Sequence, residues 1–530
     1  MSVSAGLPTP GAGERRAAAR GVAWGGVESA ATAAAGLLLT PIVVRCAGLP
    51  GLGLWGAAWS LAHTAGLFDL GVGASYGRFV ARALARRDLA DLNATLAAGS
   101  GFHILLSILL GLPALLLGPR LLAWAAPDSP RLPEARIVLA CTLLTVLLRG
   151  SLSAYRAVVG AAQRLDLLAR LGALAAVVEG CLGALVLLRG HGLSGLAIAS
   201  LAVGSAALFV EACLAHHLCP GLRLRPFVAT GVDYRHLLAF GSRLQATRAS
   251  EILGSQLPRL LLAAGPGLAA AGVYDLGARV AGLVPLLASL PLRVIVPLAA
   301  HLEARGEPRR LQALLSRSTR YVALLALPPA VLILLQAESL LLAWTGDPAP
   351  PGAAAAARCL AVATTIVLLA SPLRLLLRGC GQAGVEAAAT TCGTLLHLGL
   401  AVPLCLSLGA AGVAGAALPG AALQLLILVW GARRGGESLL PGTATRALAG
   451  PFGASVAMLL GGAFLEVVRV ARLLPGPADR LEALSSLAWR APILGALFLL
   501  SGAILGGLQL EDLSLLRPAP KAAESEGGTG

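Results

Sequence analysis

Charged residues are scarce in this 530-residue chain, where Asp, Glu, Lys and Arg together make up only 13%. Soluble globular proteins carry about twice that share. Hydrophobic residues make up 57% of the chain, and a compact water-soluble fold cannot bury so much apolar surface. The scarcity of charge therefore excludes a series of soluble domains and predicts that lipid surrounds most of the chain.

Lysine is almost absent, with Lys521 as the only example, so nearly all of the 41 basic residues are arginines. They outnumber the 26 acidic residues and give a formal net charge of +15. On a soluble protein such an excess would suggest a nucleic-acid partner. Most of these arginines lie in alternate connections between apolar runs, which is the pattern that fixes membrane topology. We therefore expect no nucleic-acid partner.

The residue patterns of catalytic and metal sites are also missing. The nine cysteines fall singly along apolar stretches without a C-x-x-C pair. Cys213, His216, His217 and Cys219 lie close together, but zinc sites usually draw ligands from two separated pairs, and no second pair is evident. No connection between apolar runs is long enough to house a catalytic domain. We predict a membrane transporter with no catalytic residues, no cofactor and no metal site.

About fourteen stretches are long and apolar enough to cross a bilayer as helices. The sequence therefore predicts an all-α polytopic membrane protein with about 14 transmembrane helices. The predicted spans lie at residues 22–45, 52–77, 93–118, 135–160, 166–189, 193–217, 234–263, 269–298, 319–345, 353–377, 384–407, 411–432, 447–468 and 486–508.

Basic residues are divided unevenly between the two sides that these spans define. Alternate connections hold about 25 of them on one side and about 11 on the other, which predicts that both termini are cytoplasmic. On the same side, residues 301–318 place leucines on one helical face and arginines around the other. This pattern predicts an amphipathic helix that lies on the membrane surface.

Three pairs of short segments recur at a spacing of 219 or 220 residues and indicate an internal repeat. Because the repeat unit holds six spans, an even number, both halves have the same orientation. They would form two six-helix lobes that are related by a pseudo-two-fold axis along the membrane normal and enclose a cavity. The matched segments are Gly53–Trp55 with Gly272–Tyr274, Gly160–Gln163 with Gly379–Gln382, and Gly192–Ala197 with Gly412–Ala417.

The repeat and the spans together predict the organisation of the chain. Two extra C-terminal helices lie outside the repeat. The predicted parts are a cytoplasmic tail at 1–21, an N-lobe at 22–217, a cytoplasmic linker at 218–233, a C-lobe at 234–432, the extra helices at 433–508 and a cytoplasmic tail at 509–530.

Several phrases in the sequence are typical of one protein family. The segment Gly48–Trp55, followed by Leu67–Gly73 and Arg78, resembles the first helical hairpin of bacterial polysaccharide flippases. Gly272–Arg279 and Tyr321–Gly346 resemble later parts of the same proteins, which belong to the multidrug/oligosaccharidyl-lipid/polysaccharide exporter superfamily. The resemblance implies a V-shaped cavity between two lobes, a lipid-linked sugar as cargo and a location in the bacterial inner membrane.

The seventh and eighth predicted spans carry several charged residues, each of which needs a partner or a cavity inside the bilayer. By spacing, Arg248 is expected to pair with Glu251, and Asp275 with Arg279. Arginines suit a diphosphate head group because the guanidinium group can donate to two phosphate oxygens at once. The alternative is that these charges only lock helices together. The candidate substrate-binding residues are Arg243, Arg248, Arg279, Arg293 and Arg149.

Intramembrane carboxylates are candidates for coupling transport to an ion gradient, with H+ or Na+ as the expected ion. Glu28 is the most deeply placed, and the repeat spacing sets it opposite Arg248. A salt bridge between lobes or a static helix-packing pair are both compatible with this placement. The ion-coupling candidates are Glu28, Asp69, Glu251 and Asp275.

The leading hypothesis is a flippase that moves an undecaprenyl-diphosphate-linked oligosaccharide or polysaccharide repeat unit by alternating access. Its expected partners are the bilayer, the anionic lipid-linked glycan and polysaccharide assembly enzymes. A lipid-linked peptidoglycan precursor as cargo, or multidrug/cation antiport on the same fold, are the alternatives. A membrane polymerase or ligase is disfavoured, since it would need a large outer loop with acid/base groups.

Overall fold

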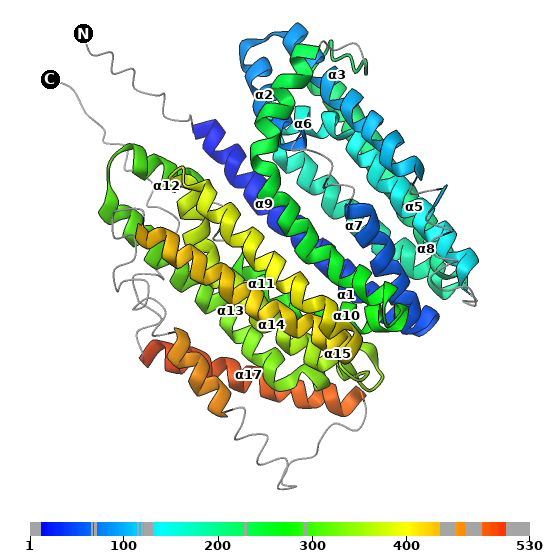
Figure 1. The fold of residues 1–530 in the computed structure, drawn as a ribbon, viewed down its shortest axis with the longest axis vertical. Helices are drawn as coiled ribbons and strands as arrows, with labels where there is room; N and C mark the ends of the chain where they lie inside the picture. Colours follow the sequence, from blue (N-terminus) through cyan, green and yellow to red (C-terminus); the bar gives the residue numbers. More distant parts are fainter. Residues whose placement is uncertain are drawn as a thin grey trace, which may run out of the picture.

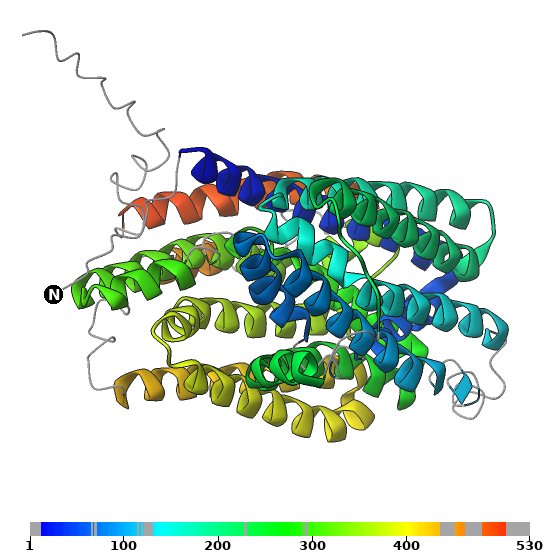
Figure 2. The ribbon, with the colours of Figure 1, turned by 90° about the horizontal axis from the view of Figure 1, so that it is seen from above.

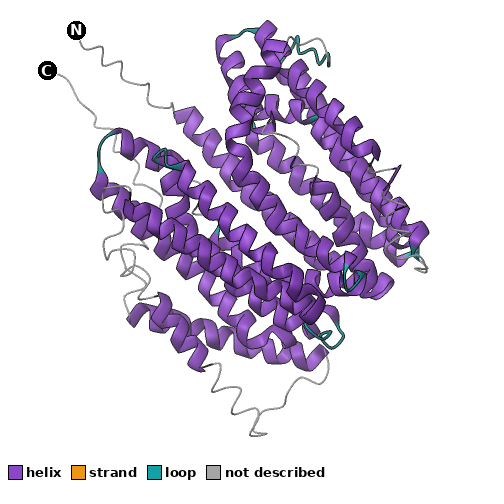
Figure 3. Ribbon diagram, viewed as in Figure 1, coloured by secondary structure: helices purple, strands orange, loops and turns teal. Residues whose placement is uncertain are grey.

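In the computed structural model, the described part of the chain consists of helices joined by short loops, and no strand occurs within it (Figure 3). The structure describes residues 12–64, 67, 72–113, 116–117, 120, 131–226, 231–289, 292, 295–434, 451–461 and 480–504.

The helices fall into an N-terminal group, a C-terminal group and a final helix (Figure 1). The first group is α1 (Ala12–Thr64), α2 (Val72–Arg86), α3 (Leu89–Leu106), the short π-helix η2 (Ser107–Gly111), α5 (Leu132–Ser151), α6 (Ser153–Ala161), α7 (Leu165–Leu188) and α8 (Gly192–Leu218). The second group is α9 (Gly231–Ala264), α10 (Leu268–Ala281), α11 (Leu283–Ala288), α12 (Ile295–Ala304), α13 (Pro308–Thr345), α14 (Ala353–Gly379) and α15 (Ala383–Arg434). The last helix is α17 (Arg480–Ile504).

Eight described helices are long and apolar enough to cross a membrane, or nine when the bent pair α5 and α6 counts as one span. Two of the eight hold two predicted spans each, because α1 is broken at Gly48 and α15 at Gly409. The predicted span 486–508 corresponds to α17, while 447–468 is described only as a shorter helix at Pro451–Gly461. The predicted all-α polytopic fold class is confirmed.

Backbone turns recur at the same spacing as the sequence repeat. Six residues with positive φ, a region that favours glycine, form three pairs whose members are 219 residues apart. These three turns of the first half therefore have counterparts in the second half, which extends the repeat from sequence to backbone geometry. The pairs are Gly48 (φ 69°) with Gly267 (φ 109°), Arg87 (56°) with Gly306 (64°), and Gly190 (84°) with Gly409 (57°).

The two repeats form two helical lobes. In Figure 1 the blue-to-cyan helices from α2 to α8 lie on one side and the helices from α11 to α15 on the other, with α1 and α9 between them. Figure 2 shows that the helices of both lobes run in nearly the same direction. Helix α17 packs along α13 at the outer edge of the second lobe.

The lobes meet where α1 crosses α10 at two glycines of the repeat. A Cβ atom on Gly53 would overlap the carbonyl oxygen of Leu268, and a Cβ atom on Gly272 would overlap the carbonyl oxygen of Leu49. Because Leu49 and Leu268 are also 219 residues apart, the contact is symmetric, and it lies on the pseudo-two-fold axis. Only glycine lets the two backbones come this close.

The predicted surface helix at 301–318 is wrong. Helix α12 ends at Ala304 and α13 begins at Pro308, so most of this stretch forms the first turns of a long membrane-spanning helix. Leu311 and Leu315 are buried in a cluster with side chains of α12, α14 and α15. The leucine face is therefore covered by protein rather than by lipid head groups, and sequence periodicity alone cannot distinguish these two partners.

Candidate functional site

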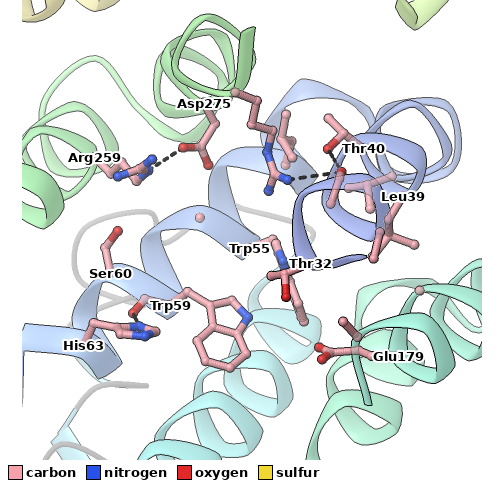
Figure 4. Close-up of a pocket in the computed structure, with 18 of the residues that line it drawn as sticks. Thr32, Leu39, Thr40, Trp55, Trp59, Ser60, His63, Glu179, Arg259 and Asp275 are labelled. Atoms are coloured by element: carbon pink, nitrogen blue, oxygen red, sulfur yellow. Dashed lines mark hydrogen bonds and ion pairs between the residues drawn. The ribbon is translucent and has the colours of Figure 1, made fainter. Parts of the chain in front are cut away.

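A cavity of about 400 Å³ lies between the lobes, where α1 meets α7, α9 and α10. Helix α1 supplies most of its wall from both sides of the break at Gly48, and the second lobe supplies the charged residues Arg259, Asp275 and Arg279. Figure 4 shows Arg259 and Asp275 of this wall on the side facing the aromatic and hydroxyl side chains of α1. The crossing of α1 and α10 thus brings residues of both repeats into one cavity.

Arg259 and Asp275 form a buried ion pair at the second-lobe wall of this cavity. The guanidinium Nε of Arg259 donates to the Asp275 carboxylate, and its Nη1 donates to the backbone oxygen of Ser255 at 2.6 Å. The guanidinium group also lies 5.8 Å from the Tyr274 ring centroid. The Asp275 carboxylate packs directly over Gly56 of α1, where no Cβ atom would fit.

Arg279 reaches across the boundary between the lobes. Its Nη1 donates to the backbone oxygen of Gly36 on α1 at 3.3 Å. The same oxygen accepts from the Thr40 hydroxyl at 2.6 Å. Arg279 therefore lines the cavity as a cation that contacts the opposite repeat, and its remaining donors are available to a ligand with phosphate oxygens.

The first-lobe wall is aromatic and carries a carboxylate. Trp55 and Trp59 stack edge to face at 6.0 Å, and the His63 ring lies 5.3 Å from that of Trp59. The Nδ1 atom of His63 is 2.8 Å from the Trp59 carbonyl oxygen. Glu179 of α7 completes the wall (Figure 4). Two arginines and two carboxylates line this cavity, so its formal charge is zero when all four are ionised.

A second cavity of about 440 Å³ lies inside the first lobe and shares Glu179 with the first. Arg156 of α6 links two carboxylates there, at 2.8 Å from Glu211 of α8 and 3.9 Å from Glu28 of α1. Glu28 packs against Gly172 of α7, where a Cβ atom would overlap its carboxylate. Three carboxylates and two arginines line this cavity, which makes it acidic by formal charge.

The predicted substrate-binding arginines are not gathered at one place. Arg279 lines the first cavity and Arg149 lines the second. Arg248 is exposed on α9, and the side chain of Arg243, on the same helix, lies outside the described part of the chain. Arg293 also lies outside the described residues, as does Asp69 among the ion-coupling candidates.

One expected pairing differs from that in the structure, and one carboxylate contacts an arginine that the sequence did not indicate. Asp275 is paired with Arg259 of α9 rather than with Arg279, which contacts α1. Glu251 is 3.0 Å from Arg374 of α14. In both cases a neighbouring helix offers a guanidinium group, and helical spacing within one span cannot predict such a contact.

Sequence reasoning missed several residues that the fold places at the two cavities. Arg259, Arg156 and Glu211 each pair with a partner on another helix, although only their depth within a span marks them. Trp55 and Trp59 face the cavity as neighbours one turn apart. The sequence marks such residues only as charges inside an apolar run, whereas the structure shows which glycine makes room for each, such as Gly56 opposite Asp275.

Comparison with known proteins is consistent with this architecture. Residues 102–348 match the family described as "Polysaccharide biosynthesis protein". No curated protein sequence matches the chain. Among solved structures, the Lipid II flippase MurJ in an inward closed conformation has a TM-score of 0.61 at 12% identity, over 92% of this chain and 99% of that one.

Two further structures share the fold. An inward-facing multidrug resistance transporter of the MATE family has a TM-score of 0.59 at 14% identity, covering 77% of this chain and 94% of its own. A transporter of the MOP superfamily from Pyrococcus furiosus has a TM-score of 0.57 at 14% identity, with 81% and 97% covered. The chain therefore has the fold of these solved transporters, and this fold together with the family match over residues 102–348 confirms the resemblance to polysaccharide flippases that the sequence showed.

Proposed function

We propose that this protein is a flippase that carries an undecaprenyl-diphosphate-linked oligosaccharide or polysaccharide repeat unit across the bacterial inner membrane by alternating access. The observation that carries the proposal is the cavity lined by both repeats, in which Arg279 of one lobe contacts α1 of the other. A head group bound there touches both lobes, so its binding free energy can favour one arrangement of the lobes over another. The match to a polysaccharide biosynthesis family supports the choice of cargo.

The diphosphate of the cargo would bind Arg279 first in this scheme. Arg259 is already paired with Asp275, whereas Arg279 is bonded to a backbone oxygen and can donate further to phosphate. We propose that the other arginine candidates, Arg243, Arg248, Arg293 and Arg149, meet the head group at other steps of its passage. The lipid tail would remain in the bilayer, and both chain termini would face the cytoplasm.

Ion coupling fits the acidic cavity of the first lobe. Glu28 and Glu211 share Arg156, so a proton or Na+ entering between them would compete with the arginine and loosen contacts among α1, α6 and α8. Glu179 borders both cavities and could link ion binding to cargo binding. We propose Glu28 as the principal coupling carboxylate. Glu251 and Asp275 are each already paired with an arginine of another helix.

Cation antiport is the second candidate function, and one observation favours it. The first-lobe wall combines Trp55, Trp59 and Glu179, and aromatic faces beside a carboxylate suit an organic cation. The two candidates therefore depend on opposite walls of one cavity. Variants of Arg279 on one wall and of Glu179 on the other therefore distinguish the two candidate functions.

We expect Arg279→Gln to reduce glycan export on the order of tenfold or more, because a hydrogen bond to a charged group contributes about 1.5–3 kcal/mol. The measurement is the amount of lipid-linked glycan that a membrane-impermeant oxidant reaches at the outer face of intact cells. Arg170→Gln is the matched control, since Arg170 stacks on Trp24 and does not line the cavity. Glu179→Gln is tested in parallel for efflux of a lipophilic cation.

Normal glycan export by Arg279→Gln at wild-type protein levels would contradict the cationic contact with the cargo. Loss of cation efflux in Glu179→Gln, with unchanged glycan export in both variants, would establish the antiporter instead. Arg243→Ala and Arg248→Ala test whether the remaining arginines of α9 take part, with loss of export expected for each.

A further inference from the structure

A crevice of about 390 Å³ lies away from the central cavity, where α1, α7, α13 and α17 come together. Its basic residues are Arg45 of α1 and Arg480 of α17, and no acidic residue is among the described residues that line it. By formal charge it is more positive than the central cavity, which is neutral, and than the acidic cavity of the first lobe.

The two arginines lie at the ends of their helices, beside apolar walls. Arg45 is three residues before the break at Gly48, so it lies within one turn, about 5 Å, of the end of that helical run. Arg480 is the first residue of α17. Leu38 lies seven residues before Arg45 on α1, about 10 Å further along the helix, and is 73% exposed. Leu188, the last residue of α7, is 68% exposed. A charged mouth above an apolar wall matches the order of head group and tail in a lipid.

Backbone contacts hold this geometry in place. The indole Nε1 of Trp344 donates to the carbonyl oxygen of Leu37 at 2.7 Å, which ties α13 to α1. The Nε of Arg480 donates to the carbonyl oxygen of Ala343 at 3.1 Å, and its guanidinium group lies over Gly346. These contacts hold the guanidinium group of Arg480 at the end of the crevice where Arg45 also lies. A tryptophan such as Trp344 beside it is typical of the depth of lipid head groups.

We propose that this crevice binds a lipid whose head group carries an anionic phosphate or diphosphate, with the phosphate between Arg45 and Arg480 and the tail along Leu38 of α1. Guanidinium groups bind phosphate with paired hydrogen bonds and remain charged when partly desolvated. The site is separate from the central cavity, so the proposal applies whether that cavity binds a glycan or an organic cation. With the predicted topology it faces the outer leaflet.

Cys46 provides a local readout, because it is exposed and lines the crevice. Cys181 of α7 is also exposed but does not line it, so it serves as an internal control. Maleimide modification of both cysteines is followed by peptide mass spectrometry on the full-length protein in detergent. The rates of modification are compared after the protein is mixed with micelles that contain phosphatidic acid, with micelles that contain phosphatidylcholine, or with inorganic phosphate and no lipid.

Phosphatidic acid is expected to slow modification of Cys46 on the order of tenfold without changing Cys181, since basic residues attract anionic lipids by about 1 kcal/mol each. Phosphatidylcholine and inorganic phosphate should give no such protection. Arg45→Gln with Arg480→Gln should abolish the protection, whereas Arg45→Lys with Arg480→Lys should retain most of it. Arg433→Gln with Arg434→Gln, at the end of α15, removes two exposed arginines elsewhere and should leave it unchanged.

Equal protection by phosphatidylcholine, or full protection in the double glutamine variant, would overturn the proposal, because apolar coverage alone would then explain the result. Protection by inorganic phosphate would show a free-anion site instead of a lipid site. Each readout is independent of glycan export, so failure of the flippase function and failure of this site are distinguishable.

Discussion

At the scale of single residues, charged side chains in this protein are held by charges of neighbouring helices. Glu386 of α15 is almost fully buried, pairs with Arg378 of α14 and lies 3.9 Å from Arg374. Arg374 in turn contacts Glu251 of α9. One carboxylate therefore joins two arginines of α14, and a charge that loses its partner inside a bilayer costs several kcal/mol.

Glu386→Gln is therefore expected to lower the free energy of unfolding by about 3 kcal/mol, because Arg374 and Arg378 lose their shared buried partner. Glu338→Gln is the matched control, since Glu338 is 69% exposed and pairs with Arg358 at the surface. Its cost should stay below about 1 kcal/mol. Thermal denaturation of both variants in detergent measures the difference, and equal stability would mean that the Glu386 network contributes little.

At the scale of helices, glycine determines where elements end and how closely they approach. The paired positive-φ residues end helices at corresponding points of the two repeats. Gly53 and Gly272 instead allow α1 and α10 to touch along their backbones. The sequence repeat predicted that these two positions correspond to each other, but it did not predict that they lie in contact.

Gly53→Ala should destabilise the protein by about 1–3 kcal/mol, because its Cβ atom would overlap the carbonyl oxygen of Leu268 and force the lobes apart. Gly26→Ala lies on the same helix with open space around it, so it should be neutral or stabilising by a few tenths of a kcal/mol. Melting temperatures in detergent compare the two. A Gly53→Ala protein as stable as Gly26→Ala would show that the crossing tolerates a wider separation.

At the scale of the whole molecule, the charge pattern predicts orientation, while the structure shows which residues share each end. Arg434 lies at the end of α15, stacked on Trp430 at 3.8 Å. Asp347 is exposed just beyond the end of α13. Following α13, α14 and the two halves of α15 in order, these positions fall on opposite sides of the membrane.

Arg434→Cys in intact cells should therefore react with an impermeant maleimide only after the inner membrane is opened, because the arginine bias places this end in the cytoplasm. Asp347→Cys should react from outside without that treatment. Labelling of the two variants before and after permeabilisation measures this. The reverse pattern would invert the topology, and outside labelling of both would overturn the number of spans.

The sequence by itself determined that lipid surrounds most of the chain, that the fold is helical and that it contains a repeat. Each of these properties depends on the composition or the periodicity of the sequence. It also marked Asp275, Arg279 and Glu28 as charges that need a partner. Only the tertiary structure decided those partners, pairing Asp275 with Arg259 and linking Glu28 to Arg156. An ion pair in lipid forms only where a neighbouring helix brings an opposite charge within about 4 Å. That distance depends on how closely the helices pack, and glycine contacts such as Gly53 against α10 determine this packing.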